Sequence, residues 1–146
     1  AVGDRICVTG RLGGSLASGH HYRFVPRLAE GAWLARRPEV RAMMDVSDGL
    51  AKDLHALTPR GAAPALTAAD LPPRPGAPVR AALTDGGRYE LVFVLSQHAE
   101  PAAFARAWRR AFPRTRLSCV GHFVPARRLP ANALDLAGYQ GYEHLR

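Results

Sequence analysis

The residues from 89 to 96 read Tyr-Glu-Leu-Val-Phe-Val-Leu-Ser and contain an unbroken apolar run, Leu91–Leu95. A short run rich in β-branched and aromatic side chains predicts a strand that is buried on both faces. Such a strand needs other strands beside it and helices on the two faces of the sheet that they form. The run therefore restricts the chain to folds in which a sheet lies between helical layers.

Further segments of the sequence have the composition of strands. Strands are predicted at residues 5–9, 42–46 and 117–124, and one short strand is predicted within the proline-rich segment 59–78. The four prolines of residues 72–78 make the rest of that segment a stiff loop.

Helical periodicity separates these strands. A stripe of Leu50, Leu54 and Leu57 predicts one helix, and the apolar residues between Phe104 and Phe112 predict a longer one with arginines on its other side. A third helix is predicted to begin near Pro26, and its buried face is predicted from four apolar residues, Leu28, Ala29, Ala32 and Trp33. We therefore expect one α+β domain over residues 1–146, with a mixed β-sheet and flanking helices in three layers, α/β/α.

The formal net charge of +8 raises the possibility of nucleic-acid binding. Nineteen of the 20 basic residues are arginine, and they are dispersed along a chain rich in Ala, Pro and Gly. Nucleic-acid binders concentrate their charge and interleave it with exposed aromatic residues, so we expect no nucleic-acid partner. The same charge suits a phosphorylated small molecule.

Other sequence features bear on the compartment. No apolar run approaches the roughly 20 residues of a membrane span, and residues 1–9 lack the basic start and apolar stretch of a signal peptide, so we expect a soluble, cytoplasmic protein without membrane contact. Cys7 and Cys119 show no metal-ligand spacing and are predicted to be buried free thiols. The chain begins at Ala1 rather than Met, so we expect it to be a piece of a longer protein.

The segment Asp45-Val46-Ser47-Asp48-Gly49 lies where a predicted strand meets a predicted helix. The N-terminus of a helix favours phosphate, and magnesium is held by one or two carboxylates together with phosphate oxygens. Because Val46 points to the core, Asp45 and Asp48 are expected to converge on the opposite side, at the end of the strand and facing solvent or a cleft. The alternative is that Ser47 and Asp48 only cap the helix.

The segment Ala42–Leu54, which contains these residues, resembles the signature of the thiamine-monophosphate kinase family. Four other segments are similar to the same family in the same order, namely Gly3–Ser15, Phe24–Leu28, Tyr89–Phe93 and Gly141–His144. The resemblance implies transfer of the terminal phosphate of ATP to thiamine phosphate, and the fold of the aminoimidazole ribonucleotide synthetase-like superfamily. Other members of that superfamily, a selenophosphate synthetase and a hydrogenase-maturation protein among them, carry threonine and glycines at this turn.

The resemblance also implies roles for single residues. Asp45 and Asp48 would bind Mg²⁺, Ser47 would contact ATP, and Tyr142 would lie against thiamine phosphate. No side chain is assigned as a catalytic acid or base, since phosphoryl transfer depends mainly on positioning and charge neutralisation. The family forms homodimers through an N-terminal domain that holds most of the ATP site, and that domain is absent from this sequence, which would correspond to the C-terminal domain.

The sequence departs from the family in one loop. The family has Gly-Glu-Asp before Tyr-Glu-Leu, and its glutamate contacts the substrate, whereas this chain has Gly86-Gly87-Arg88. Two alternatives therefore stay open: a paralogue that acts on another phosphorylated or amine-bearing small molecule, and a non-catalytic binding domain. The glycines between Gly10 and Ser15 lack the Gly-Lys-Ser/Thr of a P-loop, and the histidines receive no role.

Overall fold

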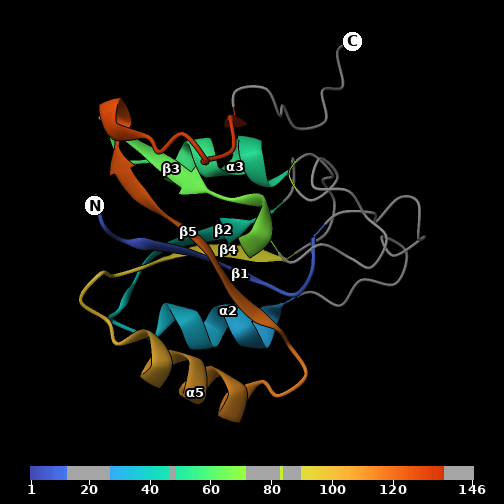
Figure 1. Ribbon diagram of the computed structural model, residues 1–146. Coiled ribbons are helices and arrows are strands. Elements are labelled where there is room, and N and C mark those ends of the chain that lie inside the picture. Colours follow the sequence, from blue (N-terminus) through green and yellow to red (C-terminus); the bar gives the residue numbers. More distant parts are fainter. Residues whose placement is uncertain (13–26, 47–48, 72–82, 84–89, 137–146) are drawn as a thin grey trace.

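A five-stranded sheet forms the centre of the molecule in a computed structural model, which describes residues 1–12, 27–46, 49–71, 83 and 90–136 (Figure 1). The strands follow the order β2-β4-β1-β5-β3 across the sheet. Their bounds are β1 Arg5–Thr9, β2 Val40–Asp45, β3 Ala62–Leu66, β4 Leu91–Leu95 and β5 Leu117–Pro125. All the strands predicted from the sequence are thus present, within a few residues of their predicted ends.

Every pairing between the described strands is antiparallel. In β4 each residue is buried, which confirms the prediction that this strand is covered on both faces. Since β4 pairs with both β2 and β1, its backbone is also enclosed from the two sides. The parallel pairing that a mixed sheet would include is not found among the described strands.

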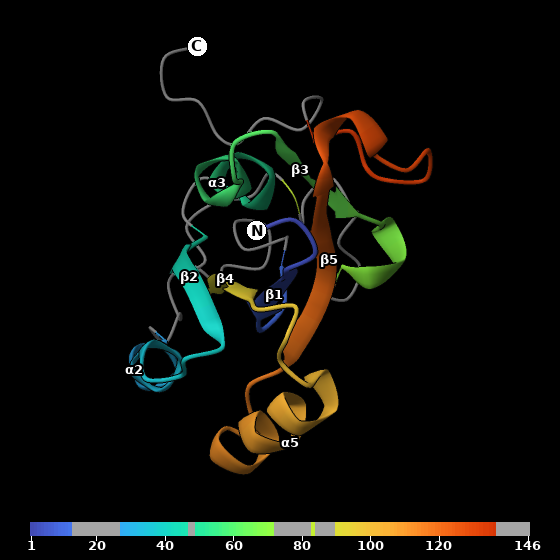
Figure 2. The same cartoon turned by 90° about the vertical axis from the view of Figure 1, so that its left-hand side faces the viewer.

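Helices cover both faces of the sheet, which confirms the three-layer arrangement (Figure 2). Helices α2 (Leu28–Ala35) and α5 (Pro101–Ala111) lie on one face, and α3 (Leu50–Leu57) lies on the other. Two short 3₁₀ turns, η2 (Ala68–Asp70) and η3 (Ala126–Arg128), follow β3 and β5.

The two faces of the sheet bury different kinds of side chain. Towards α3 the core is mainly aliphatic, and its residues include Ile6, Val8, Leu50, Leu54, Val92 and Phe123. Towards α2 and α5 it is largely aromatic. There the Trp33 ring of α2 lies edge-on to the rings of Phe104 and Trp108 of α5, with 5.6 Å between centroids in each pair, so aromatic contacts join the two helices.

The helical faces agree with the sequence for α3 and α5 but only in part for α2. Leu50 and Leu54 are fully buried in α3, as are Phe104 and Trp108 in α5, apart from a few per cent of their surface. In α2 the predicted face is confirmed for Trp33, which packs against the aromatic core, but is wrong for Ala29, Ala32 and Leu28, and Leu28 is 78% exposed. The buried residues of α2 are Leu34 and Glu30, so the face that packs on the sheet includes a charged residue.

The two cysteines lie opposite each other on neighbouring strands. Cys7 of β1 and Cys119 of β5 are Cα partners in the antiparallel register, and both are free thiols. Cys7 is buried as predicted, but Cys119 is exposed, so the prediction of two buried thiols is wrong for Cys119.

No helix in the described part of the chain has the length and apolar character needed to cross a bilayer.

Candidate functional site

Asp45 is the last residue of β2 and is exposed, although the strand around it is mostly apolar. Its Cα partner across the sheet is Leu91, the first residue of β4. Since β2 is an edge strand of the sheet, its end is reachable from solvent. The carboxylate of Asp45 therefore stands at the sheet edge, on the side from which the chain turns towards α3.

Val46, the residue after Asp45, anchors the turn to the core by a hydrogen bond and by its buried side chain. The Val46 amide donates to the carbonyl oxygen of Glu90 at 2.8 Å, and the Val46 side chain is completely buried in the aliphatic core. The predicted inward orientation of Val46 is confirmed. Its two anchors fix the backbone next to Asp45, so that the Asp45 carboxylate is presented from a defined position.

The turn ends at Gly49, the residue that precedes α3. Gly49 has φ +100°, a backbone conformation that glycine adopts without the strain that a Cβ would bring. As the N-cap residue of α3, Gly49 also lacks a side chain that could accept a hydrogen bond from the first-turn amides. Leu50 follows with its side chain fully buried. Apolar packing of Leu50 thus fixes the start of α3. The N-terminal end of a helix carries a partial positive charge, which attracts anions.

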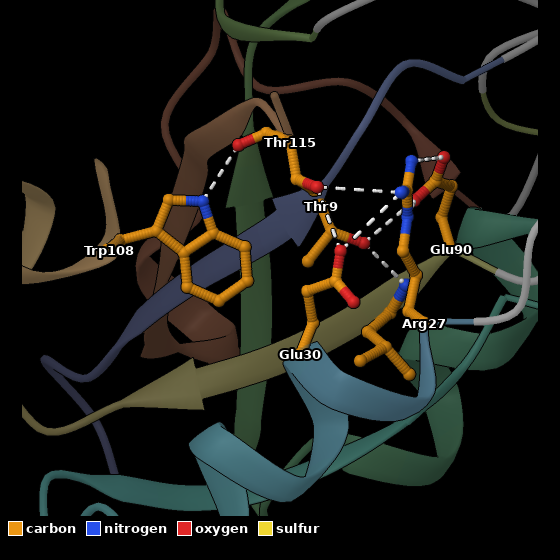
Figure 3. Close-up of polar contacts among 7 residues, drawn as sticks. Thr9, Arg27, Glu30, Glu90, Trp108 and Thr115 are labelled. Atoms are coloured by element: carbon orange, nitrogen blue, oxygen red, sulfur yellow. Dashed lines mark hydrogen bonds and ion pairs between the residues drawn. The ribbon is translucent and has the colours of Figure 1, made fainter. Parts of the chain in front are cut away.

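A second carboxylate, Glu90, stands beside this turn but is buried, with only 3% of its surface exposed (Figure 3). The Arg27 guanidinium donates two hydrogen bonds to the Glu90 carboxylate, from Nε to Oε1 at 2.8 Å and from Nη2 to Oε2 at 3.1 Å. The Thr9 hydroxyl donates to Oε1 at 2.8 Å and itself accepts from the Leu91 amide at 2.9 Å. The internal partners of Glu90 therefore occupy both of its oxygens.

The hydrogen-bond network continues from Arg27, through Glu30 and Thr115, to Trp108 of α5. The Thr115 hydroxyl donates to Glu30 Oε2 at 2.8 Å, and Arg27 Nη1 lies 3.5 Å from the same oxygen. Trp108 closes the chain of contacts, since its indole Nε1 donates to the carbonyl oxygen of Thr115 at 2.8 Å. These residues come from α2, α5 and the segment before β5, and they join all of these elements to the sheet (Figure 3).

Electrostatics and sterics both fix this arrangement. Hydrogen bonding to Glu90 raises the pKa of the Arg27 guanidinium, against a smaller opposing effect of burial, so Arg27 stays charged. Gly10 lies against the Glu90 carboxylate with φ +65°, and a Cβ at this position would collide with the carboxylate. We infer a structural role for Glu90, which the sequence signals only by a polar residue at the start of an apolar strand.

The other site residues expected from the sequence lie outside the described residues. They are Ser47, Asp48 and Tyr142, together with Gly87 and Arg88 of the altered loop. Whether Asp48 converges with Asp45, and whether Ser47 and Asp48 cap α3, are therefore questions about residues outside the described part of the chain.

As a magnesium ligand, Asp45 fits by chemistry and position. It is an exposed oxygen donor beside a helix start, which is the kind of ligand that Mg²⁺ takes from a protein. The described residues contain no cluster of three or more His, Cys, Asp or Glu side chains that could enclose a metal. Asp45 thus suits an ion that is shared with phosphate oxygens rather than an ion enclosed by protein ligands.

Basic residues that are dispersed in the sequence gather around one hollow of about 450 Å³ next to α5. Four arginines line it, Arg11, Arg109, Arg114 and Arg116, with Trp108 and Thr115 at its inner side. Arg109 belongs to α5, whereas Arg11 follows β1 and both Arg114 and Arg116 lie in the segment before β5.

Two curated relatives match this chain over nearly all of its length. It is 32% identical to a thiamine-monophosphate kinase of Rhodopirellula baltica, over 97% of this chain and 48% of the relative. It is 35% identical to a thiamine-monophosphate kinase of Halobacterium salinarum, over 94% of this chain and 52% of the relative. The chain spans about half the length of these curated relatives. No family model matches the sequence.

Solved structures share the fold. A thiamine-monophosphate kinase from Stenotrophomonas maltophilia superposes with a TM-score of 0.69 at 22% identity, over 86% of this chain and 49% of that one. The hydrogenase maturation protein HypE of E. coli gives the same TM-score at 18% identity, over 93% of this chain and 50% of that one. A HypE in complex with ATP gives 0.61 at 15% identity over 91% of this chain and 46% of that one. At these identities the superpositions show a common fold.

Proposed function

We propose that this chain, which is related to the thiamine-monophosphate kinases and matches about half of their length, is the C-terminal domain of such a kinase. In this proposal it contributes magnesium, ATP and substrate contacts to the transfer of a phosphate from ATP to thiamine phosphate. The observation that carries the proposal is a likeness at 32% identity along almost the whole chain. The exposed Asp45 at the end of β2 supports it, because a kinase of this kind needs oxygen ligands there.

In the proposed site Asp45 and Asp48 hold Mg²⁺ and Ser47 contacts ATP. When bound, the ion would neutralise charge on the transferring phosphate. Val46 and Gly49 act on the same site through the backbone, because they set the path from β2 into α3. The start of α3 adds the positive end of a helix dipole next to the bound phosphates.

Positioning is the main task of this chain in the proposed reaction. The acceptor is itself a phosphate, whose oxygens are already ionised, so no side chain has to remove a proton from it. The Glu90–Arg27 pair holds α2 and the start of β4 together behind the Asp45 turn. A rigid support of this kind keeps Asp45 in place, and a misplaced ligand costs rate in such reactions.

Recognition of the substrate is assigned to Tyr142, whose ring would lie against thiamine phosphate. Gly87 and Arg88 stand where the family has two carboxylates, and this difference favours a second candidate, a paralogue that phosphorylates another phosphorylated or amine-bearing small molecule. A site that lacks an expected polar contact loses discrimination for the original ligand. We therefore expect thiamine phosphate to be handled weakly.

A second half must complete the site. We propose that an N-terminal domain carries most of the ATP site and forms a homodimer, and that the whole protein works in the cytoplasm. The length covered in the relatives, 48% and 52%, leaves room for such a domain. Residues 1–146 alone should then show no turnover.

The test compares the full-length protein with residues 1–146 alone, each supplied with ATP, Mg²⁺ and thiamine phosphate. We expect thiamine diphosphate from the full-length protein and none from residues 1–146. A full-length protein that binds ATP but phosphorylates only other acceptors would support the paralogue. Absence of ATP binding and of all transfer in the full-length protein would refute the kinase proposal and leave a binding domain.

A further inference from the structure

Cys7 and Cys119 form a cross-strand pair that the proposed kinase chemistry does not use. They are Cα partners between β1 and β5, and a register irregularity between Ile6 and Cys7 lies directly beside them. Directly opposed residues of an antiparallel pair have Cα atoms about 4.5 to 5.5 Å apart, which is within the range of about 4.4 to 6.8 Å found for disulfides. As Cα partners in this register, Cys7 and Cys119 are therefore placed close enough for a disulfide without rearrangement of the strands.

The two thiols differ in access. Cys7 is only 3% exposed and packs in the aromatic core, whereas Cys119 is exposed. Cys119 opens on a hollow of about 340 Å³, whose other lining residues are Gly3, Arg5, Asp70, Gly121 and His122. A small molecule from solvent can therefore reach Cys119 first, with Cys7 directly behind it.

The surroundings of Cys119 favour its thiolate. A hydrogen bond from the Cys7 thiol lowers the pKa of Cys119 to about 6, with help from the Gly121 backbone and the Arg5 charge and against partial burial and the Asp70 carboxylate. The same sulfur–sulfur contact, together with burial, raises the pKa of Cys7, which keeps its proton. Arg5 also has a buried Nη1 without a hydrogen-bond partner among the described residues. This N–H group can therefore donate a hydrogen bond to a group that forms beside the two cysteines.

We propose that Cys119 and Cys7 form an oxidation site, in which Cys119 is the thiol attacked first and Cys7 is the resolving thiol. The oxidant is a hydroperoxide. The Cys119 thiolate attacks one peroxide oxygen, the O–O bond breaks, and the two electrons leave with the other oxygen, which departs as hydroxide or alkoxide. Cys119 becomes a sulfenic acid, and Cys7 then attacks its sulfur to form the Cys7–Cys119 disulfide and release water.

A closed disulfide would join β1 to β5 covalently across 112 positions of sequence (119 minus 7). The two strands are already neighbours in the sheet, so closure asks for little backbone movement. An exposed low-pKa thiol beside a resolving thiol is the arrangement that redox-sensing cysteines share.

The first test adds a small excess of hydrogen peroxide to reduced chain and follows the intact mass. We expect a monomeric product that has lost two hydrogen atoms, contains a Cys7–Cys119 cross-linked peptide and returns to the starting mass with dithiothreitol. The same treatment of chain unfolded in urea should give little of this product, because the strands no longer hold the thiols together. Stepwise over-oxidation of Cys119 without the cross-link, or a cross-link formed equally fast in urea, would overturn the proposal.

Two single variants separate the roles of the thiols. In Cys7→Ser, Cys119 should stop at the sulfenic acid, which a dimedone probe captures. In Cys119→Ser, the buried Cys7 should stay reduced under the same conditions. Capture on Cys7 in the second variant, or no capture on Cys119 in the first, would contradict the assignment, and the circular dichroism of each variant shows whether it is folded.

The pH dependence of Cys119 alkylation gives a further readout. At pH 7 the fraction of Cys119 present as thiolate would be about thirtyfold higher than for an ordinary thiol. A thiolate of lower pKa is also about tenfold less nucleophilic, which offsets most of this gain in rate. The pH midpoint of alkylation is therefore more informative than its rate. We expect a midpoint near pH 6 in the parent and a higher one in Cys7→Ser and in Arg5→Gln. A parent midpoint at the ordinary value of about 8.5 would refute the role given to Cys7 and Arg5.

Discussion

Asp45 and Glu90 are two carboxylates at the same end of the sheet, and they are held in opposite ways. Asp45 is exposed at the end of an edge strand, whereas Glu90 is almost fully buried and shared between Arg27 and Thr9. Their backbones are neighbours, because the amide of Val46, the residue after Asp45, donates a hydrogen bond to the Glu90 carbonyl oxygen. The sheet thus places a carboxylate with internal partners directly behind one that faces solvent.

The difference teaches how a structural acid is told from a candidate functional one. A buried carboxylate whose oxygens accept from an arginine and a threonine has little capacity left for a ligand, and removing it destabilises the fold because its partner is left unpaired. An exposed carboxylate costs little to keep ionised, and it can bind a cation without losing an internal partner. Substitutions at the two positions should therefore separate stability from activity.

The largest effect on stability is expected for Glu90→Gln. The change keeps the shape of the side chain but leaves the Arg27 charge in a partly buried site without its main partner, at a cost of about 3 kcal/mol. Urea unfolding of the chain measures this cost. Glu39→Gln, at the residue just before β2, is the matched control and should change stability by less than about 0.5 kcal/mol. Equal, small effects at Glu39 and Glu90 would remove the structural role given to Glu90.

The sequence predicts much of the fold because apolar pattern and burial coincide in most elements. The run Leu91–Leu95 is buried at each position, and the leucine stripe of residues 50–57 is the face of α3 that packs on the sheet. Asp45 could be found for the complementary reason. A carboxylate that interrupts an apolar strand has to face away from the core or find a partner.

The remaining features depend on contacts between distant residues. Arg27 and Glu90 are 63 positions apart, and neither the pattern of α2 nor that of β4 indicates that they pair. Glu30 explains the wrong part of the prediction for α2, because it turns inward to Arg27 and Thr115 while Leu28 lies in solvent. The exposure of Cys119 likewise contrasts with the burial of its strand neighbour Val120, and the apolar run around both residues does not distinguish them.

The second prediction concerns acids that this chain lacks. The double change Gly87→Glu with Arg88→Asp would restore two carboxylates near the start of β4. A hydrogen bond to a charged group contributes about 1.5 to 3 kcal/mol, so kcat/KM for thiamine phosphate in the full-length protein should rise about ten- to a hundredfold. A parent as efficient as an ordinary kinase of the family, or no gain on restoration, would show that Tyr142 and other groups carry recognition.

A smaller effect tests the outer part of the network around Glu90. Thr115→Val removes the hydroxyl that donates to Glu30 and should cost about 1 kcal/mol of unfolding free energy. Glu30→Gln in the same chain completes a double-mutant cycle. Since the two groups are in contact, their costs should be non-additive by more than about 0.5 kcal/mol. Additive costs would separate Thr115 from the network.

The smallest effect on stability is expected for Asp45→Asn. The side chain is exposed, so the free energy of unfolding should change by no more than about 0.5 kcal/mol in the absence of Mg²⁺. The measurement is urea unfolding with a chelator present. A loss of more than about 2 kcal/mol would mean that Asp45 is a structural acid like Glu90, and the contrast between them would fail.

The most direct test of the central claim measures kcat/KM for phosphate transfer against Mg²⁺ concentration in the full-length protein, with and without Asp45→Asn. Loss of a metal ligand should lower kcat/KM at least about a hundredfold at low Mg²⁺ and shift the Mg²⁺ requirement upwards. Glu39→Gln, at the residue that precedes the same strand, should leave both quantities within about twofold of the parent. An Asp45→Asn enzyme with the parent's rate and Mg²⁺ requirement would contradict the account.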